Sequence, residues 1–529
     1  MPPIRPLPDS PDLDQLRRQA KDLLRAARAA DSTALARFRS LPSLTRAGDE
    51  DLARVPLALH DAQSVIAREH GFASWNALRE RVEELTLGLD DAVREFVEAA
   101  TDGRTSRAER LLALHPRIAG ASLHSALVLG DAGAVESHLT RRPALAHEAG
   151  GPRGWEPLHY VCHTSLGRSP VASAEGLVAI ARRLLALGAD PNTRFPWLHH
   201  GVRRPVLWGA TRATGLHALA ALLLDAGADP NDGVTLPIAA SAGDVSTLEL
   251  LRAHGADPNQ PWASDGATAL YAILQWARTP VGIQWLLEHG ADPDPVFAAN
   301  GETPLHAVAR RWDVAVAEQL VARGADVSRR RADGRTPYAV AELNGNRAVA
   351  DWLRARGAWN ELGEVDRLVA AAARGDRAAA DAMLAARPML RDEITAEHYA
   401  VLHRAAEAGD VGALALLLDC GFDPSRGDEE IGKTALHSAA MAGRPDAVRL
   451  LLARGASPNV RDREFHAQPL VWAAEGARSH HERAREYAEV GRLLLDAGSS
   501  TEWEPGDEPA EGIVETLVEW QRDLGARVP

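Results

Sequence analysis

His159, Cys162 and His163 form the grouping in this chain whose residue types and spacing come closest to a metal site. On a helix, the i, i+4 spacing places His159 and His163 on one face, as zinc ligation requires. His199 and His200 follow in a longer loop and could complete such a set. However, Cys162 also suits a small buried position, and His159 falls where a repeated pattern, described below, explains it. We therefore predict no metal and no cofactor.

The other titratable groups lack the organisation that catalysis needs. We interpret the chain as lacking a P-loop, a G-x-G-x-x-G after a strand, a G-x-S-x-G and an H-E-x-x-H. Paired acids such as Glu429 and Glu430 are typical of loop surface rather than of a general acid–base pair. The sequence predicts no catalytic residue and no enzyme. Two alternatives stay open, which are an enzyme with its site in residues 1–88 and a ligand or metal sensor near His159.

A pattern of fixed period organises most of the chain. Its clearest copy is residues 301–335, GETPLHAVARRWDVAVAEQLVARGADVSRRRADGR. The step from Thr303 to Thr336 is 336 − 303 = 33 residues, the period of ankyrin repeats, whose signature is T-P-L-H-x-A. Pro304 suits the first turn of a helix, and Gly324 suits the left-handed end of a second one. The stretch therefore resembles an ankyrin repeat.

The resemblance implies an all-α ankyrin-repeat solenoid, built of helix-turn-helix repeats with short β-hairpin or loop fingers. Residues 1–88 fall outside the pattern, and their helical stripes predict a helical N-terminal module. This module resembles one found at the head of bacterial ankyrin-repeat proteins. We expect a first repeat array over 92–360, a second over 366–503 after a restart of the pattern, and a C-terminal capping helix over 504–529. The copies number about twelve.

The composition narrows the class of partner. The chain has 529 residues and a formal net charge of −14, which argues against nucleic acid or an anionic membrane as the default partner. Its two cysteines are far apart and indicate a reducing compartment without disulfides. The N-terminus lacks the apolar segment of a signal peptide, and no apolar run reaches membrane-spanning length. We expect a soluble, cytoplasmic and monomeric protein.

Aromatic residues supply the candidate contacts. The chain has 13 Trp against 7 Phe and 5 Tyr, and large aromatics often anchor protein interfaces. The stretch 192–205 is longer and more aromatic than a usual turn between repeats, and we expect it to form a β-hairpin finger. The sequence thus predicts a scaffold or adaptor for protein–protein interaction, which presents a concave surface to an unidentified protein partner. The candidate partner-binding residues are Phe195, Trp197, Arg203, Arg204, Trp208, Trp262, Trp276 and Arg329.

Overall fold

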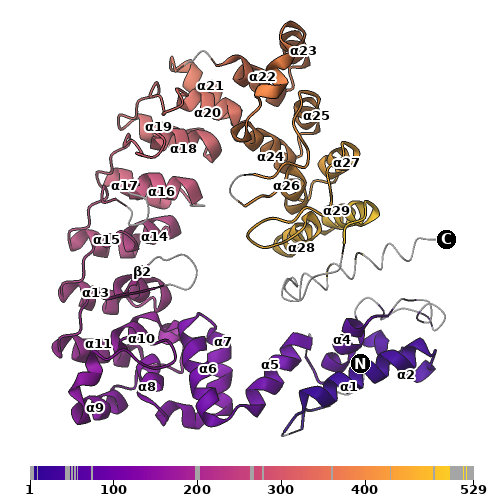
Figure 1. The fold of residues 1–529 in the computed structure, drawn as a ribbon. Helices are drawn as coiled ribbons and strands as arrows, with labels where there is room; N and C mark the ends of the chain where they lie inside the picture. Colours follow the sequence, from indigo (N-terminus) through magenta and orange to yellow (C-terminus); the bar gives the residue numbers. More distant parts are fainter. Residues whose placement is uncertain are drawn as a thin grey trace. The chain divides into compact units, whose positions relative to one another are not determined.

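The chain is mainly helical (Figure 1), which confirms the expected all-α class. It divides into two compact units, unit 1 with Met1–Ala269 and Ala277–Leu286, and unit 2 with Leu270–Trp276 and Leu287–Pro529. In the part of the chain that is described, no helix is long and apolar enough to cross a membrane. The computed structural model describes residues 5–8, 10–41, 44, 48, 52, 55, 57–72, 75–196, 203–261, 267–276, 279–358, 362–428, 431–480, 483–500, 516 and 520.

Unit 1 begins with a helical module that has its own apolar core. The module buries a face of α1 and α4 together with Phe38, which is 0% exposed. Arg37 Nε and Nη2 donate to the two carboxylate oxygens of Glu69 at 2.7 and 2.8 Å. Asp61 accepts from the Ala58 amide and so caps α4, which gives this carboxylate a structural task. The helices are α1 (Leu13–Arg28), α2 (Ser32–Arg37), η1 (Phe38–Ser40), α4 (Leu59–Glu69) and α5 (Trp75–Thr86).

Helix pairs follow in unit 1, and in each pair a short turn joins a first helix to a second. First helices pack against neighbouring first helices, and second helices against second helices, because neither can bury its apolar face alone. Short 3-10 turns, η3 (Pro116–Gly120) and η4 (Pro143–Ala146), close two early copies. The pairs are α6 (Leu89–Thr101) with α7 (Thr105–Leu114), α8 (Leu123–Leu129) with α9 (Ala132–Arg141), α10 (Pro157–His163) with α11 (Ala174–Ala186), α12 (Val206–Trp208) with α13 (His217–Asp225), and α14 (Thr235–Ala242) with α15 (Val245–Ala253).

The third pair carries two additions to the repeat, of which the sequence predicts the second. Between its helices lies an extra segment with a 3-10 turn, η5 (Ser165–Arg168). After it, β1 (Arg194–Pro196) pairs antiparallel with β2 (Arg203–Pro205), which confirms the predicted hairpin finger. The chain then enters α12 and a π-helical turn, η6 (Gly209–Ala213). Such turns are rare and are often found at functional sites.

Unit 2 repeats the same helix–turn–helix plan. Its first helices α18 to α28 pack in order, as do the second helices α25, α27 and α29. The pair α16 (Ala269–Trp276) and α17 (Val281–Glu288) spans the division between the units. The remaining pairs are α18 (Pro304–Arg311) with α19 (Val314–Val321), α20 (Pro337–Leu343) with α21 (Arg347–Ala355), α22 (Glu364–Ala373) with α23 (Arg377–Ala386), α24 (Tyr399–Ala408) with α25 (Val411–Asp419), α26 (Ala435–Met441) with α27 (Pro445–Ala453), and α28 (Pro469–Ser479) with α29 (Ala484–Asp496); the 3-10 turns are η7 (Pro388–Glu393) and η8 (Ala396–His398).

The histidine near the start of a first helix makes structural hydrogen bonds with both ring nitrogens. His306 Nδ1 accepts from the Thr303 amide at 3.2 Å and lies 2.9 Å from Thr303 Oγ1, while its Nε2 lies 3.2 Å from the carbonyl oxygen of Arg335 in the next copy. His437 makes the same two contacts with Thr434. The threonine caps the helix and the histidine links adjacent copies, so this motif holds the stack together.

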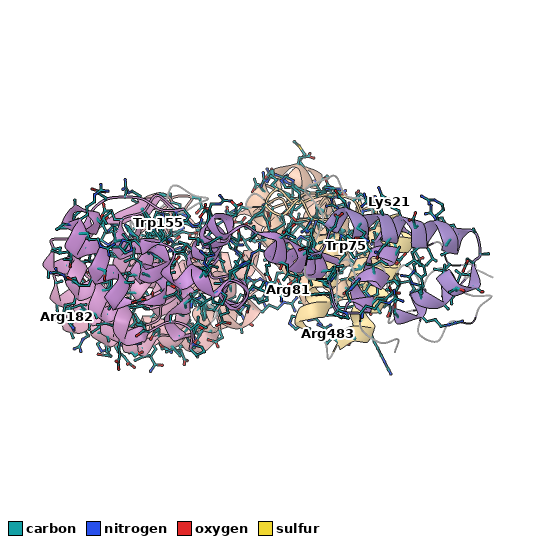
Figure 2. The ribbon with its side chains drawn as sticks, turned by 90° about the horizontal axis from the view of Figure 1, so that it is seen from below. Lys21, Trp75, Arg81, Trp155, Arg182 and Arg483 are labelled. Carbon is teal, nitrogen blue, oxygen red and sulfur yellow. The ribbon has the colours of Figure 1, made fainter. Side chains whose placement is uncertain are left out.

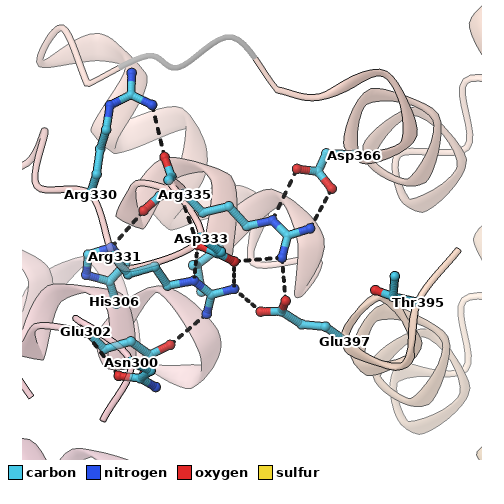
Figure 3. Close-up of polar contacts among 12 residues, drawn as sticks. Asn300, Glu302, His306, Arg330, Arg331, Asp333, Arg335, Asp366, Thr395 and Glu397 are labelled. Carbon is cyan, nitrogen blue, oxygen red and sulfur yellow. Dashed lines mark hydrogen bonds and ion pairs between the residues drawn. The ribbon is translucent and has the colours of Figure 1, made fainter. Parts of the chain in front are cut away.

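Polar contacts also join the loop before α20 to the helices that follow it in unit 2 (Figure 3). Arg331 Nη1 donates to Glu302 Oε1 at 2.7 Å, and Arg331 also pairs with Glu397. Arg335 Nη2 donates to Asp366 Oδ1 at 2.9 Å and pairs with Glu397 as well. The side chains of Glu302 and Asp366 are only 1% and 9% exposed. Such buried charges depend on their partners, and these contacts cross the point where the sequence pattern restarts.

The end of unit 2 is closed by a tryptophan on a helix. Trp520 is 6% exposed and belongs to the apolar core of unit 2. A Cβ atom on Gly491 of α29 would lie 2.1 Å from Trp520 Cε3, so this helix position admits only glycine while the indole packs there. Most of the predicted capping helix, 504–529, lies outside the described residues, and the predicted domain boundaries stay predictions.

Candidate functional site: a cavity beside the hairpin

The hairpin folds back onto the first helix of the third pair. Phe195 of β1 is 4% exposed, and its ring centre lies 4.2 Å from that of Trp155 and 4.6 Å from that of His163. On the other side, the Arg204 guanidinium lies 4.3 Å above the Trp208 ring. The result is a packed group of aromatic rings in which the hairpin is a fixed part of the wall.

A cavity of about 350 Å³ lies against these rings. Trp155, which Figure 2 labels among the helices of unit 1, forms one wall and is partly exposed. Arg153 pairs with Asp102, and its guanidinium lies 5.8 Å from the Trp155 ring centre. Arg194 Nη2 donates to the carbonyl oxygen of Asp232 at 2.8 Å. Both arginines line the cavity with their orientation fixed by the surrounding repeats.

The helix that lines this cavity departs from the Thr-x-x-His pattern. Glu156 stands where the most regular copies have threonine, as at Thr303, Thr336 and Thr434. His159 Nε2 lies 3.3 Å from Thr193 Oγ1, but His159 Nδ1 is buried and has no partner in the described structure. Glu156 lines the cavity, and its carboxylate makes no hydrogen bond or ion pair with a described residue. Breaks in a local rule without a structural gain are expected at functional positions.

The same geometry bears on the possible zinc site. Burial lowers the pKa of His159 to about 4 and holds the pKa of His163 well below its ordinary value. Cys162 is fully buried, and burial raises the pKa of its thiol, which disfavours the thiolate that zinc requires. Among the described residues, no three His, Cys, Asp or Glu side chains are placed to share a metal ion. His199 and His200 lie outside the described residues.

Two stretches, residues 280–362 and 368–462, match the family model for ankyrin repeats (3 copies). These two stretches are ankyrin repeats. The match confirms the predicted repeat type, and the helix pairs have the form that this repeat requires. One similar solved structure is the ankyrin repeat domain of human ASB11, which is 24% identical, covers 46% of this chain and 100% of that chain, and has a TM-score of 0.33. No curated protein matches the chain.

The hairpin brings together four of the residues predicted to contact a partner. Phe195 and Trp208 are 4% and 9% exposed, so they pack inside the finger rather than at its surface, and their contact with a partner stays a prediction. Arg203 is exposed, and its Nη2 donates to the carbonyl oxygen of Arg194 at 3.0 Å. Aromatic residues were expected at the surface because they are frequent at interfaces, but the long finger packs its own aromatic residue inward.

The other four predicted residues are separated from this cavity in the chain. Arg329 lies on a finger of unit 2, where its Nη2 donates to Asp294 Oδ2 at 2.6 Å. Trp276 ends α16. Trp197 and Trp262 lie outside the described residues. Their contact with a partner therefore stays a prediction.

Sequence reasoning missed Arg153, Trp155 and Glu156 as residues of the site. The signal for Glu156 was present, because a glutamate occupies the threonine position of an otherwise regular ankyrin tetrapeptide. Arg153 and Trp155 carried no such signal. They meet the hairpin only because the loop before α10 folds against β1.

A second correction concerns residues 427–434, GDEEIGKT, which have the G-x-x-x-x-G-K-T spacing of a P-loop. In the structure the described part of this stretch follows α25, and a β-bridge joins Gly427 to Thr434. Asp428 Oδ1 accepts from the Ile431 and Gly432 amides at 2.9 and 2.8 Å. The amides that would cradle a phosphate are therefore occupied by a carboxylate of the loop itself, and we infer no nucleotide site from the spacing.

Proposed function

We propose that this ankyrin-repeat protein is a scaffold or adaptor that binds a protein partner and uses the cavity beside the hairpin as a contact site. Ankyrin repeats generally serve protein–protein interaction, which supports the general role. The observation that carries the site is the convergence of departures from the repeat pattern. The glutamate at the threonine position, the long finger and the π-helical turn all meet in the third and fourth repeats.

The cavity suits recognition because its walls are already ordered. Arg153 is held by Asp102 and also donates to the carbonyl oxygen of Glu98 at 3.1 Å. Trp155 is fixed against Phe195. A partner that enters such a site orders few side chains, so more of the contact energy appears as affinity. No observation on the described residues favours an enzyme or a sensor, and neither is proposed.

The test uses Glu156→Thr in the full chain, because this change separates folding from binding. Threonine restores the pattern of the regular repeats, such as the one that begins at Thr303, and removes only the carboxylate of a residue that lines the cavity. We expect capture of the partner to fall by at least about tenfold, since a charge-assisted contact is worth about 1.5–3 kcal/mol, while the melting temperature holds or rises. Affinity capture with quantitative mass spectrometry compares this variant with wild type.

Arg449→Gln is the matched control, because Arg449 makes exposed ion pairs with Asp446 and Glu489 far along the chain in α27. It should capture the same proteins as wild type. If Glu156→Thr retains the full set of captured proteins at unchanged amounts, the cavity is not a contact site.

A further inference from the structure

A second cavity, of about 380 Å³, is lined by three arginines and one acid. It lies in unit 2, where Arg347 begins α21, Arg377 begins α23, and Arg374 ends α22. Asp410, just before α25, is the acidic residue of the lining. Three of the lining residues are positive and one is negative. Three more carboxylates pair with these arginines from outside the lining, namely Glu342, Asp351 and Asp419.

The arginines at this cavity have structural partners, but these use only part of each guanidinium group. Arg347 Nη2 donates to the carbonyl oxygen of Ala373 and lies 3.4 Å from Asp410 Oδ2. Arg377 Nη2 donates to Asp419 Oδ2 at 2.7 Å.

Arg374 also uses only part of its guanidinium group for structural contacts. Its Nε donates to Glu342 Oε2 at 2.9 Å, and its Nη2 donates to Glu342 Oε1 and, at 3.3 Å, to Asp351. Each of the three side chains has further N–H groups, among them Nη1, that meet no acceptor in the described part of the chain.

The position of two of these arginines is unfavourable for the helices alone. A helix begins at a partial positive charge, so a cation as its first residue gains nothing from the helix dipole. Arg347 gains a favourable contact elsewhere, because it donates to the carbonyl oxygen of Ala373 at the end of α22. Arg377 has only the exposed pair with Asp419, in which the two side chains are 55% and 36% exposed. Its place at the cavity therefore lacks a sufficient structural reason.

We propose that this cavity binds a phosphate monoester dianion, carried by a phosphorylated side chain of the protein partner. Arginine forks match the oxygens of such a group, which bears a charge of about −1.5 to −2 near neutral pH. A carboxylate offers one charge and two oxygens, so it would leave one of the three guanidinium groups without a match. The cavity volume lies within the range of small-ligand pockets. The proposal that this cavity binds an anion is independent of the proposed function. The proposal that the anion belongs to a protein partner rests on the proposed function.

The test is ³¹P NMR line broadening with the full chain and two probes. The probes are the peptide acetyl-Gly-phosphoserine-Gly-amide and inorganic phosphate. Acetyl-Gly-Glu-Gly-amide serves as competitor. We expect the phosphopeptide signal to broaden on addition of wild-type protein, to resist the glutamate peptide, and to titrate with an apparent Kd below that of inorganic phosphate.

Two variants test whether the phosphopeptide binds in this cavity. Arg377→Gln should weaken phosphopeptide binding at least tenfold, and Ala415→Glu, which adds a carboxylate to the cavity lining, should abolish it. Arg444→Gln is the matched control, because Arg444 also precedes a second helix and donates to the carbonyl oxygen of Glu407 at 2.9 Å, but it does not line the cavity. It should bind as wild type does.

Absence of broadening, or equal broadening in every variant, overturns the anion site. Efficient displacement by the glutamate peptide overturns the choice of a dianion. Equal affinity for inorganic phosphate overturns the assignment to a phosphorylated partner. None of these readouts involves the cavity beside the hairpin, so failure here and failure of the proposed function are distinguishable.

Discussion

At the scale of single residues, Glu156 and His159 tell most about this chain. In regular ankyrin copies the threonine hydroxyl satisfies the histidine Nδ1, as Thr303 does for His306. Glu156 leaves His159 Nδ1 buried without a partner. An unmet buried polar atom costs free energy of unfolding, so the third repeat is locally weakened where the cavity opens.

Glu156→Thr should therefore stabilise the third repeat by about 1 kcal/mol, the usual worth of a capping hydroxyl. Hydrogen exchange of the α10 amides, residues 157–163, should slow about fivefold to tenfold. Thr434→Ala, which removes the same contact from a regular copy, should accelerate exchange in α26. Unchanged exchange in α10 would show that Glu156 already satisfies the histidine in solution.

Buried histidines should make unit 2 sensitive to mild acid. Burial lowers the pKa of His403 and of His437 to about 4 from the ordinary 6.5. The unfolded chain thus binds more protons between these values, so stability is full above about pH 6.5 and is lost as the pH falls toward 4, by at most about 3 kcal/mol per histidine. Circular dichroism melts should show a lower melting temperature at pH 5 than at pH 7, and a smaller drop for His403→Gln. A drop of equal size in that variant would assign the effect to other groups.

At this scale the repeated pattern indicates the structural histidines of the regular copies, such as His306 and His437. The sequence did not predict which aromatic side chains are buried. Phe195 and Trp208 are apolar rings on or next to an unusually long finger, and only the fold of β1 onto α10 decides that they are buried. Trp312 stands where Gly130 and Gly243 end other first helices in the left-handed region, and its extended backbone, φ −96° and ψ 170°, reshapes the turn after α18.

At the scale of elements, arginines tie the start of a second helix to the end of the neighbouring first helix. Arg483, before α29, donates to the carbonyl oxygens of Ala442 and Gly443 at 2.9 and 2.8 Å. Arg444 does the same with Glu407 of α24. A cation is favourable at a helix C-terminus, so these contacts fix the spacing between successive copies.

The packing of Trp520 on α29 gives a test of the C-terminal closure. Gly491→Ala should displace the indole, because the added methyl would lie 2.1 Å from Trp520 Cε3, at a cost of about 2 kcal/mol. Amide exchange over residues 484–496 should accelerate, while exchange in α26 should not change. Gly498→Ala is not a suitable control because its φ is +86°. Ala488→Gly, on the same helix, reports a propensity cost of about 1 kcal/mol together with the loss of the contact that Ala488 makes with the core.

The sequence placed most of these elements correctly. It predicted the finger after Asn192 from the ankyrin resemblance, because this stretch is longer than a usual turn between repeats. The role of Trp520 could not be predicted, since it depends on a glycine 29 residues earlier, 520 − 491, in another helix. Nor could spacing show that a β-bridge joins Gly427 to Thr434.

At the scale of the whole molecule, the joint where the sequence pattern restarts is held by charge. Arg335→Gln should leave the largely buried Asp366 with only His398, whose Nε2 lies 2.9 Å away, and with no guanidinium. We expect a loss of about 3 kcal/mol, as for other broken buried ion pairs. Exchange of the α22 amides, residues 364–373, should rise steeply.

Arg329→Gln is the control for this change, because Arg329 is 43% exposed in its pair with Asp294 and should cost about 0–1 kcal/mol. If the two variants exchange alike in α22, the charged contacts of Figure 3 do not carry the joint. The sequence indicated a restart near this point but gave no reason to expect contacts across it, because Arg331 and Glu397 are 66 residues apart.

The central claim is that the departures from the ankyrin pattern, rather than its regular positions, determine binding. The most direct test is the Kd of the partner recovered by capture, measured by isothermal titration calorimetry for wild type and for Glu156→Thr. We predict a Kd at least tenfold higher for the variant, together with slower amide exchange in α10. An unchanged Kd in a folded variant would contradict the account.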